Sequence, residues 1–283
     1  NFLIFLSIKD HNNISLIINF TMIILPIIFM KFNLNKIYIH LYIFITYNAQ
    51  YMAYIENIIN LEITREWKDA FPGASVGVLV MRNTVNPKNN PDLDNKMKEI
   101  EDEIRNNFSE SGREGIRALP TIRSYTEYYK KFKKTYHVML QLESVALKNR
   151  NLPRISALVS AMFAAELKNQ LLTAGHDISK LQRPIVLNIA TGNESYTGMN
   201  GKVQNLNSDD MFISDNVGVI SSIIYGPDNR TPITSDTTDV MFTVYGPSGI
   251  STEQIKNHLE DISSYVKLVS TDAITDVLEI YSN

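Results

Sequence analysis

Two short segments of the sequence carry side chains that could exchange protons with a substrate. His176 precedes Asp177 directly, and an imidazole beside a carboxylate can act as a proton shuttle. Asp209, Asp210 and Asp215 could form paired carboxylates for general acid and base catalysis. Both segments also have a structural interpretation, because a loop histidine is often structural and the sequence LNSDD is typical of a turn that leads into a strand. No catalytic residue is identified.

The motifs of several common enzyme classes are absent from the sequence. It contains no dinucleotide-binding glycine fingerprint, no phosphate-binding loop and no serine nucleophile elbow. Cys is also absent, which excludes a thiol nucleophile and fits a reducing compartment such as the cytoplasm. His137, His176 and His258 are too far apart for a local metal motif. We therefore predict no metal and no cofactor.

A basic segment in the middle of the chain could contact phosphate groups. Residues 113–183 hold 13 Lys and Arg against 5 Asp and Glu, whereas the flanking segments are acidic. The RNA-binding candidates are Lys130, Lys131, Lys133, Lys134, Arg150 and Arg154. Tyr125, Tyr128 and Tyr129 could stack on bases, although aromatic residues at helical spacing are usually part of a core. The lysines could equally form the solvated face of a helix.

The elements that must position these side chains follow from the hydrophobic pattern. Apolar residues at helical spacing predict helices over 93–108, 138–148, 155–172 and 252–266, and Ser251 with Gln254 has the spacing of a capping box. Short apolar runs predict strands over 74–81, 185–190, 211–214, 219–225 and 240–244. Asn200-Gly201 and Gly226-Pro227 predict turns. Helices followed by a strand-rich second half indicate an α+β fold.

The first 51 residues differ from the rest of the chain. They are dominated by Ile, Asn, Phe and Leu and contain no Gly, Val, Glu, Arg or Trp. This composition is typical of translated AT-rich DNA, so we expect residues 1–51 to be an apolar leader outside the mature protein. The alternative is a membrane anchor, because residues 11–30 contain no charged side chain. Residues 52–283 are expected to form the domain. No membrane contact is expected unless residues 1–51 are part of the mature protein.

Several short segments follow one another in an order that is found in a known family. They occupy residues 152–160, 177–181, 193–194, 199–201, 206–215 and 237–242. The sequence DISKL resembles the family's Asp-Leu-Asp-Lys-Leu, and LNSDDMFISD resembles its Leu-Asn-x-Asp-x-Leu-Val-Ile-x-Asp strand. The family is the B3/B4 (tRNA-binding and editing) domain of the phenylalanyl-tRNA synthetase beta subunit. The resemblance covers roughly residues 120–249.

This resemblance implies a fold and a function. The fold would be the mixed sheet-and-helix sandwich of the B3/B4 domain, and its pocket would grip an aminoacylated 3′ end and hydrolyse mischarged tRNA. The partner would be tRNA or aminoacyl-tRNA and not DNA. The chain shows no synthetase catalytic module, so it is expected to be a stand-alone B3/B4 protein and not a complete phenylalanine-tRNA ligase.

Two departures from the family's motifs concern the pocket. On an ungapped count from Asp215, Asn229 replaces the family's pocket Glu, so a neutral amide stands where a carboxylate could accept from a tyrosyl hydroxyl. The family's Leu-His-x-Phe-Asp corresponds to LTAGHD at 172–177, where the His is at a different place. Both departures argue against inherited specificity for tyrosine.

Three classes of function remain open. The first is an aminoacyl-tRNA deacylase acting in trans, and the resemblance then gives the pocket candidates His176, Glu194, Asp215, Asn229 and Arg230. The second is a non-catalytic RNA-binding module. The third is a pocket for a small molecule, for example an amino acid, on the same fold.

Overall fold

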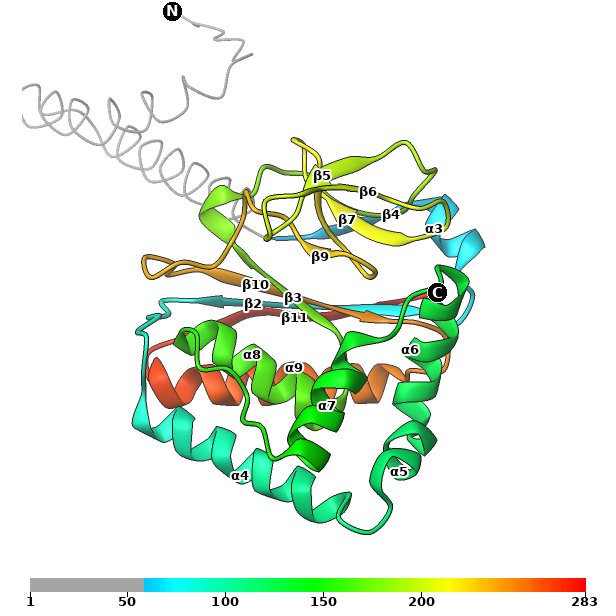
Figure 1. Ribbon diagram of the computed structural model, residues 1–283. Coiled ribbons are helices and arrows are strands. Elements are labelled where there is room, and N and C mark those ends of the chain that lie inside the picture. The colour runs from blue at the N-terminus through cyan, green and yellow to red at the C-terminus, as the bar shows by residue number, and fades with distance from the viewer. Residues whose placement is uncertain (1–58) are drawn as a thin grey trace, which may run out of the picture. The chain divides into compact units, whose positions relative to one another are not determined.

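Three layers make up residues 59–283, the part of the chain that the computed structural model describes (Figure 1). Helices cover one face of a four-stranded sheet, and a five-stranded sheet lies on its other side. This arrangement confirms the predicted α+β sandwich. The predicted leader, residues 1–51, lies outside the described residues. Among the residues that are described, no helix is long and apolar enough to cross a membrane.

The four-stranded sheet lies in the middle of the layers and is antiparallel throughout, in the order β11-β2-β10-β3. Its strands are β2 (Ser75–Arg82), β3 (Thr173–Asp177), β10 (Val240–Gly246) and β11 (Ile274–Ser282). β2 is buried from Ser75 to Met81 because both faces of the sheet are covered there. Gly77 permits close packing, since a Cβ there would lie 2.4 Å from Ile255 Cγ2.

The five-stranded sheet has the order β1-β4-β7-β8-β9, and only β1 and β4 in it run parallel. Its strands are β1 (Leu61–Ile63), β4 (Ile185–Ile189), β7 (Met211–Ser214), β8 (Val219–Ser222) and β9 (Gly226–Pro227). A separate hairpin joins β5 (Ser195–Thr197) to β6 (Val203–Asn205). Its turn includes Gly201, whose φ of 73° is the left-handed conformation that glycine favours.

The helices cluster in the first half of the domain and at its end. They are α3 (Arg65–Ala70), α4 (Pro91–Asn107), α5 (Gly112–Ala118), α6 (Pro120–Lys131), α7 (His137–Lys148), α8 (Ala157–Asn169) and α9 (Thr252–Val269), with a 3₁₀ turn at Ile178–Lys180. The predicted capping box of α9 is confirmed, because the Ser251 and Gln254 side chains each bond the other's backbone amide.

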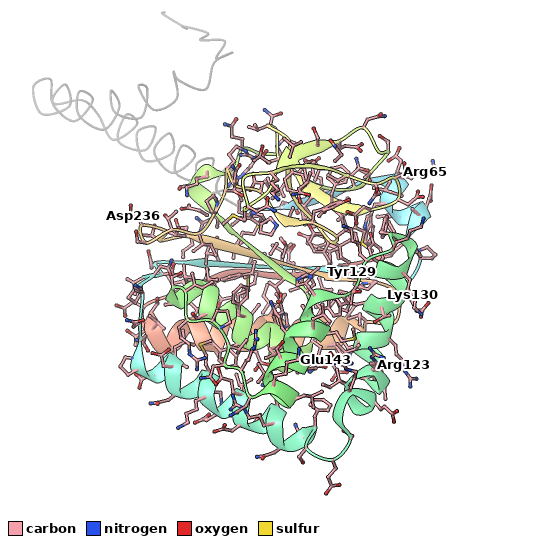
Figure 2. All side chains as sticks on the ribbon, in the orientation of Figure 1. Arg65, Arg123, Tyr129, Lys130, Glu143 and Asp236 are labelled. Carbon is pink, nitrogen blue, oxygen red and sulfur yellow. The ribbon has the colours of Figure 1, made fainter. Side chains whose placement is uncertain are left out.

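The aromatic side chains of α6 tie this helix to both sheets. Tyr125, Tyr128 and Tyr129 are all buried, so the prediction that they could stack on bases is wrong. The Tyr128 hydroxyl donates to Asp210 Oδ1 at 2.9 Å, and the Tyr129 hydroxyl donates to the Ile223 carbonyl at 2.7 Å. Figure 2 shows Tyr129 in the interior and Lys130 on the outer side of the same helix. Aromatic residues at helical spacing are here core residues.

The predicted and observed elements differ at several places, and the helix expected over 252–266 extends to Val269. The helix expected over 155–172 spans only Ala157–Asn169, because Gln170 adopts a left-handed conformation with φ of 54°. The strand expected over 219–225 ends at Ser222. The predicted turn at Gly226-Pro227 is the short strand β9.

Candidate functional site

Strand β3 forms one edge of the four-stranded sheet, and this edge contacts other elements. Hydrogen bonds that flank it, from Tyr245 N to the Leu172 carbonyl and from Ile178 N to the Asp239 carbonyl, show that its even-numbered positions face β10. The odd-numbered amides therefore point outward. Thr173 N donates to Glu166 Oε2 at 3.0 Å, and Asp177 N donates to the Thr231 carbonyl at 3.0 Å.

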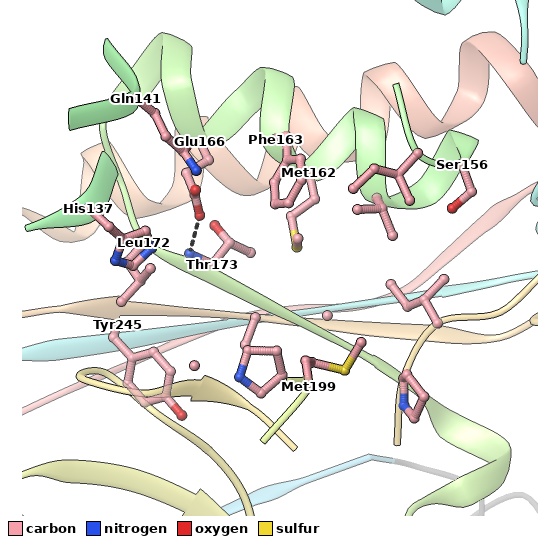
Figure 3. A pocket seen from close by; sticks show the side chains of 18 of the residues that line it. His137, Gln141, Ser156, Met162, Phe163, Glu166, Leu172, Thr173, Met199 and Tyr245 are labelled. Atoms are coloured by element: carbon pink, nitrogen blue, oxygen red, sulfur yellow. Dashed lines mark hydrogen bonds between the residues drawn. The ribbon is translucent and has the colours of Figure 1, made fainter. Parts of the chain in front are cut away.

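A cavity of about 400 Å³ lies along this edge, between helices α7 and α8, strand β3 and the segment 226–233 (Figure 3). Most of its lining is apolar: Ile155, Val159, Met162, Phe163, Leu172, Ala174, Met199, Pro227, Pro232 and Ile233. A few polar side chains are placed among these, which is the usual composition of a small-molecule site. They are His137, Gln141, Ser156, Glu166, Thr173, Ser222 and Tyr245.

Glu166 supplies the acidic side chain of this lining. It projects from α8 and is 3% exposed, and burial raises the pKa of its carboxyl to about 8. The hydrogen bond from Thr173 N opposes this shift but does not cancel it. At pH 7 the group is therefore mainly protonated, and the cavity is close to neutral.

The buried side chain of His258 contacts Thr173 in the wall of the cavity. The Thr173 hydroxyl lies 2.7 Å from His258 Nε2, and the other ring nitrogen of His258 lies 3.2 Å from the Asn169 side-chain amide. Burial lowers the pKa of His258 to about 4, so the ring is neutral at pH 7. This network fixes Thr173 next to Glu166 without adding charge to the cavity.

The segment before α8 ends in two residues that line the cavity, and an ion pair holds this segment in place. Glu101 is buried on α4, accepts from Leu152 N at 2.8 Å and also pairs with the Arg154 guanidinium. Ile155 and Ser156, which follow directly, line the cavity. Arg154 was predicted to contact RNA, but its guanidinium is engaged by Glu101 and by the Leu152 carbonyl. These bonds hold Arg154 against the segment that leads to the cavity.

Two of the five predicted pocket residues bind each other. Arg230 Nη1 and Nη2 lie 2.9 and 2.8 Å from the two carboxylate oxygens of Asp215. Asp215 also accepts from three backbone amides, those of Gln182, Val217 and Gly218. These hydrogen bonds lower the pKa of Asp215 although burial opposes them. The pair is a fully bonded structural unit and does not line the cavity.

His176 is buried in strand β3, and the prediction that it lies in a loop is wrong. Its Nδ1 lies 2.8 Å from the Thr231 hydroxyl, which itself donates to Asp228. Burial lowers the pKa of His176 to about 3, and the positive charge of Arg230 adds to the effect. His176 does not line the cavity, and a ring that stays neutral and bonded to Thr231 is not placed to shuttle protons there.

The remaining pocket candidates lie in loops. The Glu194 carboxylate accepts from Thr191 N and Gly192 N within its own turn. Asn229 is exposed, and its backbone amide donates to the Thr197 carbonyl at 2.9 Å. The structure therefore places none of the five candidates in the lining of the cavity, although His176 and Arg230 lie close to its wall in sequence.

The predicted turn before β7 is present, and it buries one of its two acids. Asp209 has a left-handed φ of 71°, whereas the Asp210 carboxyl is buried and accepts from the Tyr128 hydroxyl. Burial raises the pKa of Asp210 to about 7. Asp210 anchors α6 to the sheet, and no hydrogen bond joins it to Asp215 in the described part of the chain.

The predicted basic residues are mostly exposed around the end of α6. Lys130 pairs with Glu127 at 2.7 Å, whereas Lys131 and Lys134 lie over the rings of Tyr128 and Tyr225, at 5.7 and 5.4 Å from the ring centroids. Lys133 and Arg150 are exposed as well. Only two residues separate Lys134 from His137 at the rim of the cavity, so the basic segment and the cavity lining are neighbours along the chain.

The local sequence pattern does not indicate the polar residues that line the cavity. His137 is remote from the other histidines in the sequence, and Glu166 belongs to no motif. One signal was present for Glu166, because it follows the apolar stretch AMFAA. Most residues of this helix, α8, are buried. An acid at such a position is buried or exposed depending on tertiary packing, which the pattern alone does not contain.

One protein family matches more than half of the chain. The family model described as the B3/4 domain matches residues 122–279. Among solved structures, the fold is similar to an N-terminal fragment of the phenylalanyl-tRNA synthetase beta-subunit from Pyrococcus horikoshii, with 12% identity and a TM-score of 0.40. That match covers 78% of this chain and 50% of the other, so the chain spans about half the length of that fragment. A search of curated proteins found no match.

Proposed function

This chain belongs to the B3/4 domain family, and on that premise we propose that it is a tRNA-associated protein whose cavity receives the acyl group of an aminoacyl-tRNA. The proposed reaction is hydrolysis of the ester of a mischarged tRNA, carried out in trans in the cytoplasm. The proposed acyl group carries an uncharged side chain.

The observation that carries this proposal is the position of the cavity next to the basic segment. Lys131, Lys133 and Lys134 precede His137, which lies at the cavity rim, by three to six positions. An RNA backbone held by the lysines would bring a 3′ end to the mouth of the cavity. Its volume of about 400 Å³ is within the range of roughly 300 to 1,000 Å³ that is typical of small-ligand sites.

The lining supports an uncharged acyl group. Counted back without gaps from Asp177, the position of the His in the family's Leu-His-x-Phe-Asp motif is Ala174, and Ala174 lines the cavity. The wall is therefore apolar where the motif has a polar ring. Glu166 is mainly protonated at pH 7, so it can donate a hydrogen bond without repelling an apolar group.

The first test uses the full chain and a panel of correctly and wrongly charged tRNAs, with release of the amino acid followed over time. We expect faster release than in buffer for tRNAs that carry apolar or small neutral amino acids and none for those that carry Asp, Glu, Lys or Arg. Val159→Phe, which fills the cavity, should abolish the effect. Leu268→Phe, on an exposed part of α9, is the matched control. Equal rates with and without protein across the panel would contradict hydrolysis.

A non-catalytic RNA-binding module is the second candidate. The exposed lysines at the end of α6 favour it, because they require no chemistry in the cavity. A protein of this kind would bind charged and uncharged tRNA equally, and Val159→Phe would leave the affinity unchanged. Titration of tRNA binding with both forms of the RNA separates the two candidates.

A further inference from the structure

His137 is the histidine of the cavity lining, and its ring is held from two sides. It is the first residue of α7, at the cavity rim. The ring centroid lies 6.2 Å from that of Tyr129 and 5.9 Å from that of Tyr136, which it meets edge to face. Figure 3 shows the ring at the same end of the cavity as Glu166. Because both tyrosines are core residues, the orientation of the imidazole is fixed by buried side chains.

The hydrogen bonds of Tyr129 determine which ring nitrogen carries the proton. The Tyr129 hydroxyl has one hydrogen, and it donates this hydrogen to the Ile223 carbonyl at 2.7 Å. The same oxygen lies 3.4 Å from His137 Nδ1, a long contact in which it can only accept. Nδ1 therefore carries the hydrogen, and Nε2 has the free lone pair. Within residues 59–283, no side chain or backbone group bonds Nε2.

The surroundings of His137 keep its ring neutral. The residue is exposed at the rim, yet the walls around the ring exclude enough water that burial lowers its pKa below the ordinary value. The titratable groups around the ring and the cavity are Tyr129 of α6, Tyr136, Glu166 of α8 and Tyr245 of β10. The pKa of each of these four groups is raised by burial, so all four are mainly uncharged at pH 7. The exposed Arg150, which lines the outer groove next to His137, is a charged side chain nearby and also disfavours a protonated ring.

We infer that His137 is the general base of the proposed ester hydrolysis, with Nε2 accepting a proton from the attacking water. The water oxygen forms a bond to the ester carbonyl carbon, and the proton moves to Nε2. When the tetrahedral intermediate collapses, the bond to the ribose oxygen breaks and Nε2 returns the proton to that oxygen. The products are the free amino acid and the tRNA hydroxyl, so atoms and charge balance. This inference rests on the proposed function, because it needs an ester in the cavity.

The test compares His137→Gln with the wild-type full chain, using the tRNA that is hydrolysed fastest. We expect the single-turnover rate to fall by about 100-fold or more, the usual contribution of a general base. The acid limb of the wild-type pH profile, with a midpoint below 6.5, should disappear in the variant. The affinity for a tRNA that carries the amino acid through a non-hydrolysable amide should not change. Leu140→Ala, exposed on the same helix and outside the cavity lining, is the control.

A second variant separates the base from a purely structural role. Tyr129→Phe removes the hydroxyl that fixes the tautomer but keeps the buried ring, so we expect an intermediate loss of rate and a shifted acid limb. If His137→Gln retains the wild-type rate and acid limb, the inference is overturned while the proposed function stands. If the wild type hydrolyses no charged tRNA, both the inference about His137 and the proposed hydrolysis fail.

Discussion

The Glu166 carboxyl and the Thr173 backbone amide join helix α8 to the edge strand β3, with Oε2 accepting at 3.0 Å. Only a short segment separates the two elements, and Thr173 is also bonded through its hydroxyl to His258. The single acidic group in the cavity lining therefore serves a structural contact at the same time. Its protonation couples the cavity to the stability of the domain.

Replacement of Glu166 by Gln tests this coupling. The pKa of Glu166 is raised to about 8 in the folded protein, so the folded state binds this proton more tightly than the unfolded state does. The wild type should therefore lose stability as the pH rises from about 4.5 to about 8, whereas Glu166→Gln should not. Each tenfold difference in proton affinity is about 1.4 kcal/mol. We expect the variant to be more stable by a few kcal/mol at pH 9 and not at pH 5, as measured by denaturant unfolding.

His176 should have the opposite effect on the pH dependence. Its pKa is lowered to about 3 in the folded protein, so its stabilising contribution is complete above about pH 6.5 and is lost as the pH falls toward 3. His176→Asn keeps an N–H donor for Thr231 but cannot titrate. We expect the unfolding free energy of the variant to fall less steeply between pH 6.5 and 4 than that of the wild type. Parallel curves would show that His176 is protonated alike in both states.

The sequence predicts the parts of the fold in which local pattern and tertiary packing agree. The apolar run that forms β2 and the capping box of α9 appear where they were expected. Strands β3 and β11 were not predicted. β3 contains Gly175, His176 and Asp177, which resemble a loop by composition and become a strand only by pairing with β10. The alternation of buried and exposed side chains is weak in β11, because it is an edge strand whose side chains are only partly buried.

Asp215 and Arg230 should matter unequally for stability. Arg230→Ala leaves the Asp215 carboxylate bonded to three backbone amides. We therefore expect the free energy of unfolding to fall by about 1 to 2 kcal/mol. Asp215→Ala removes the partner of all three amides and of the guanidinium, and should cost about 3 to 5 kcal/mol. Urea unfolding measures both. Neither variant, if folded, should change hydrolysis, because neither side chain lines the cavity. Loss of hydrolysis in a folded Arg230→Ala protein would extend the site to this pair.

Lys134 should contribute to tRNA affinity through salt-dependent contacts. If it contacts one phosphate, Lys134→Gln should reduce the slope of log affinity against log salt by about 0.7, the value for single-stranded RNA. Lys98→Gln, at an exposed position of α4, is the matched control and should leave the slope unchanged. Fluorescence anisotropy over a series of salt concentrations gives both slopes. An unchanged slope for Lys134→Gln would remove this residue from the RNA interface.

The candidate site was harder to predict than the fold. His176 and Asp177 attract notice because they are adjacent in the sequence, yet their side chains bond Thr231 and Thr237, away from the cavity lining. His137 and Glu166 are 29 positions apart and meet at one cavity only because α7 and α8 pack side by side. A constellation assembled from separate helices leaves no local spacing that could be recognised.

The outward amides of β3 also bear on the solubility of the folded protein. An edge strand with unpaired donors can recruit a strand from another molecule and start aggregation. At this edge the Thr173 and Asp177 amides are already bonded to Glu166 and Thr231. At the opposite edge, β11 carries the exposed acid Glu279 and the ion pair of Asp276 with Arg82, and charged side chains on an edge strand disfavour pairing with a second copy. The central sheet is thus protected from intermolecular growth by bonded amides at one edge and by charge at the other.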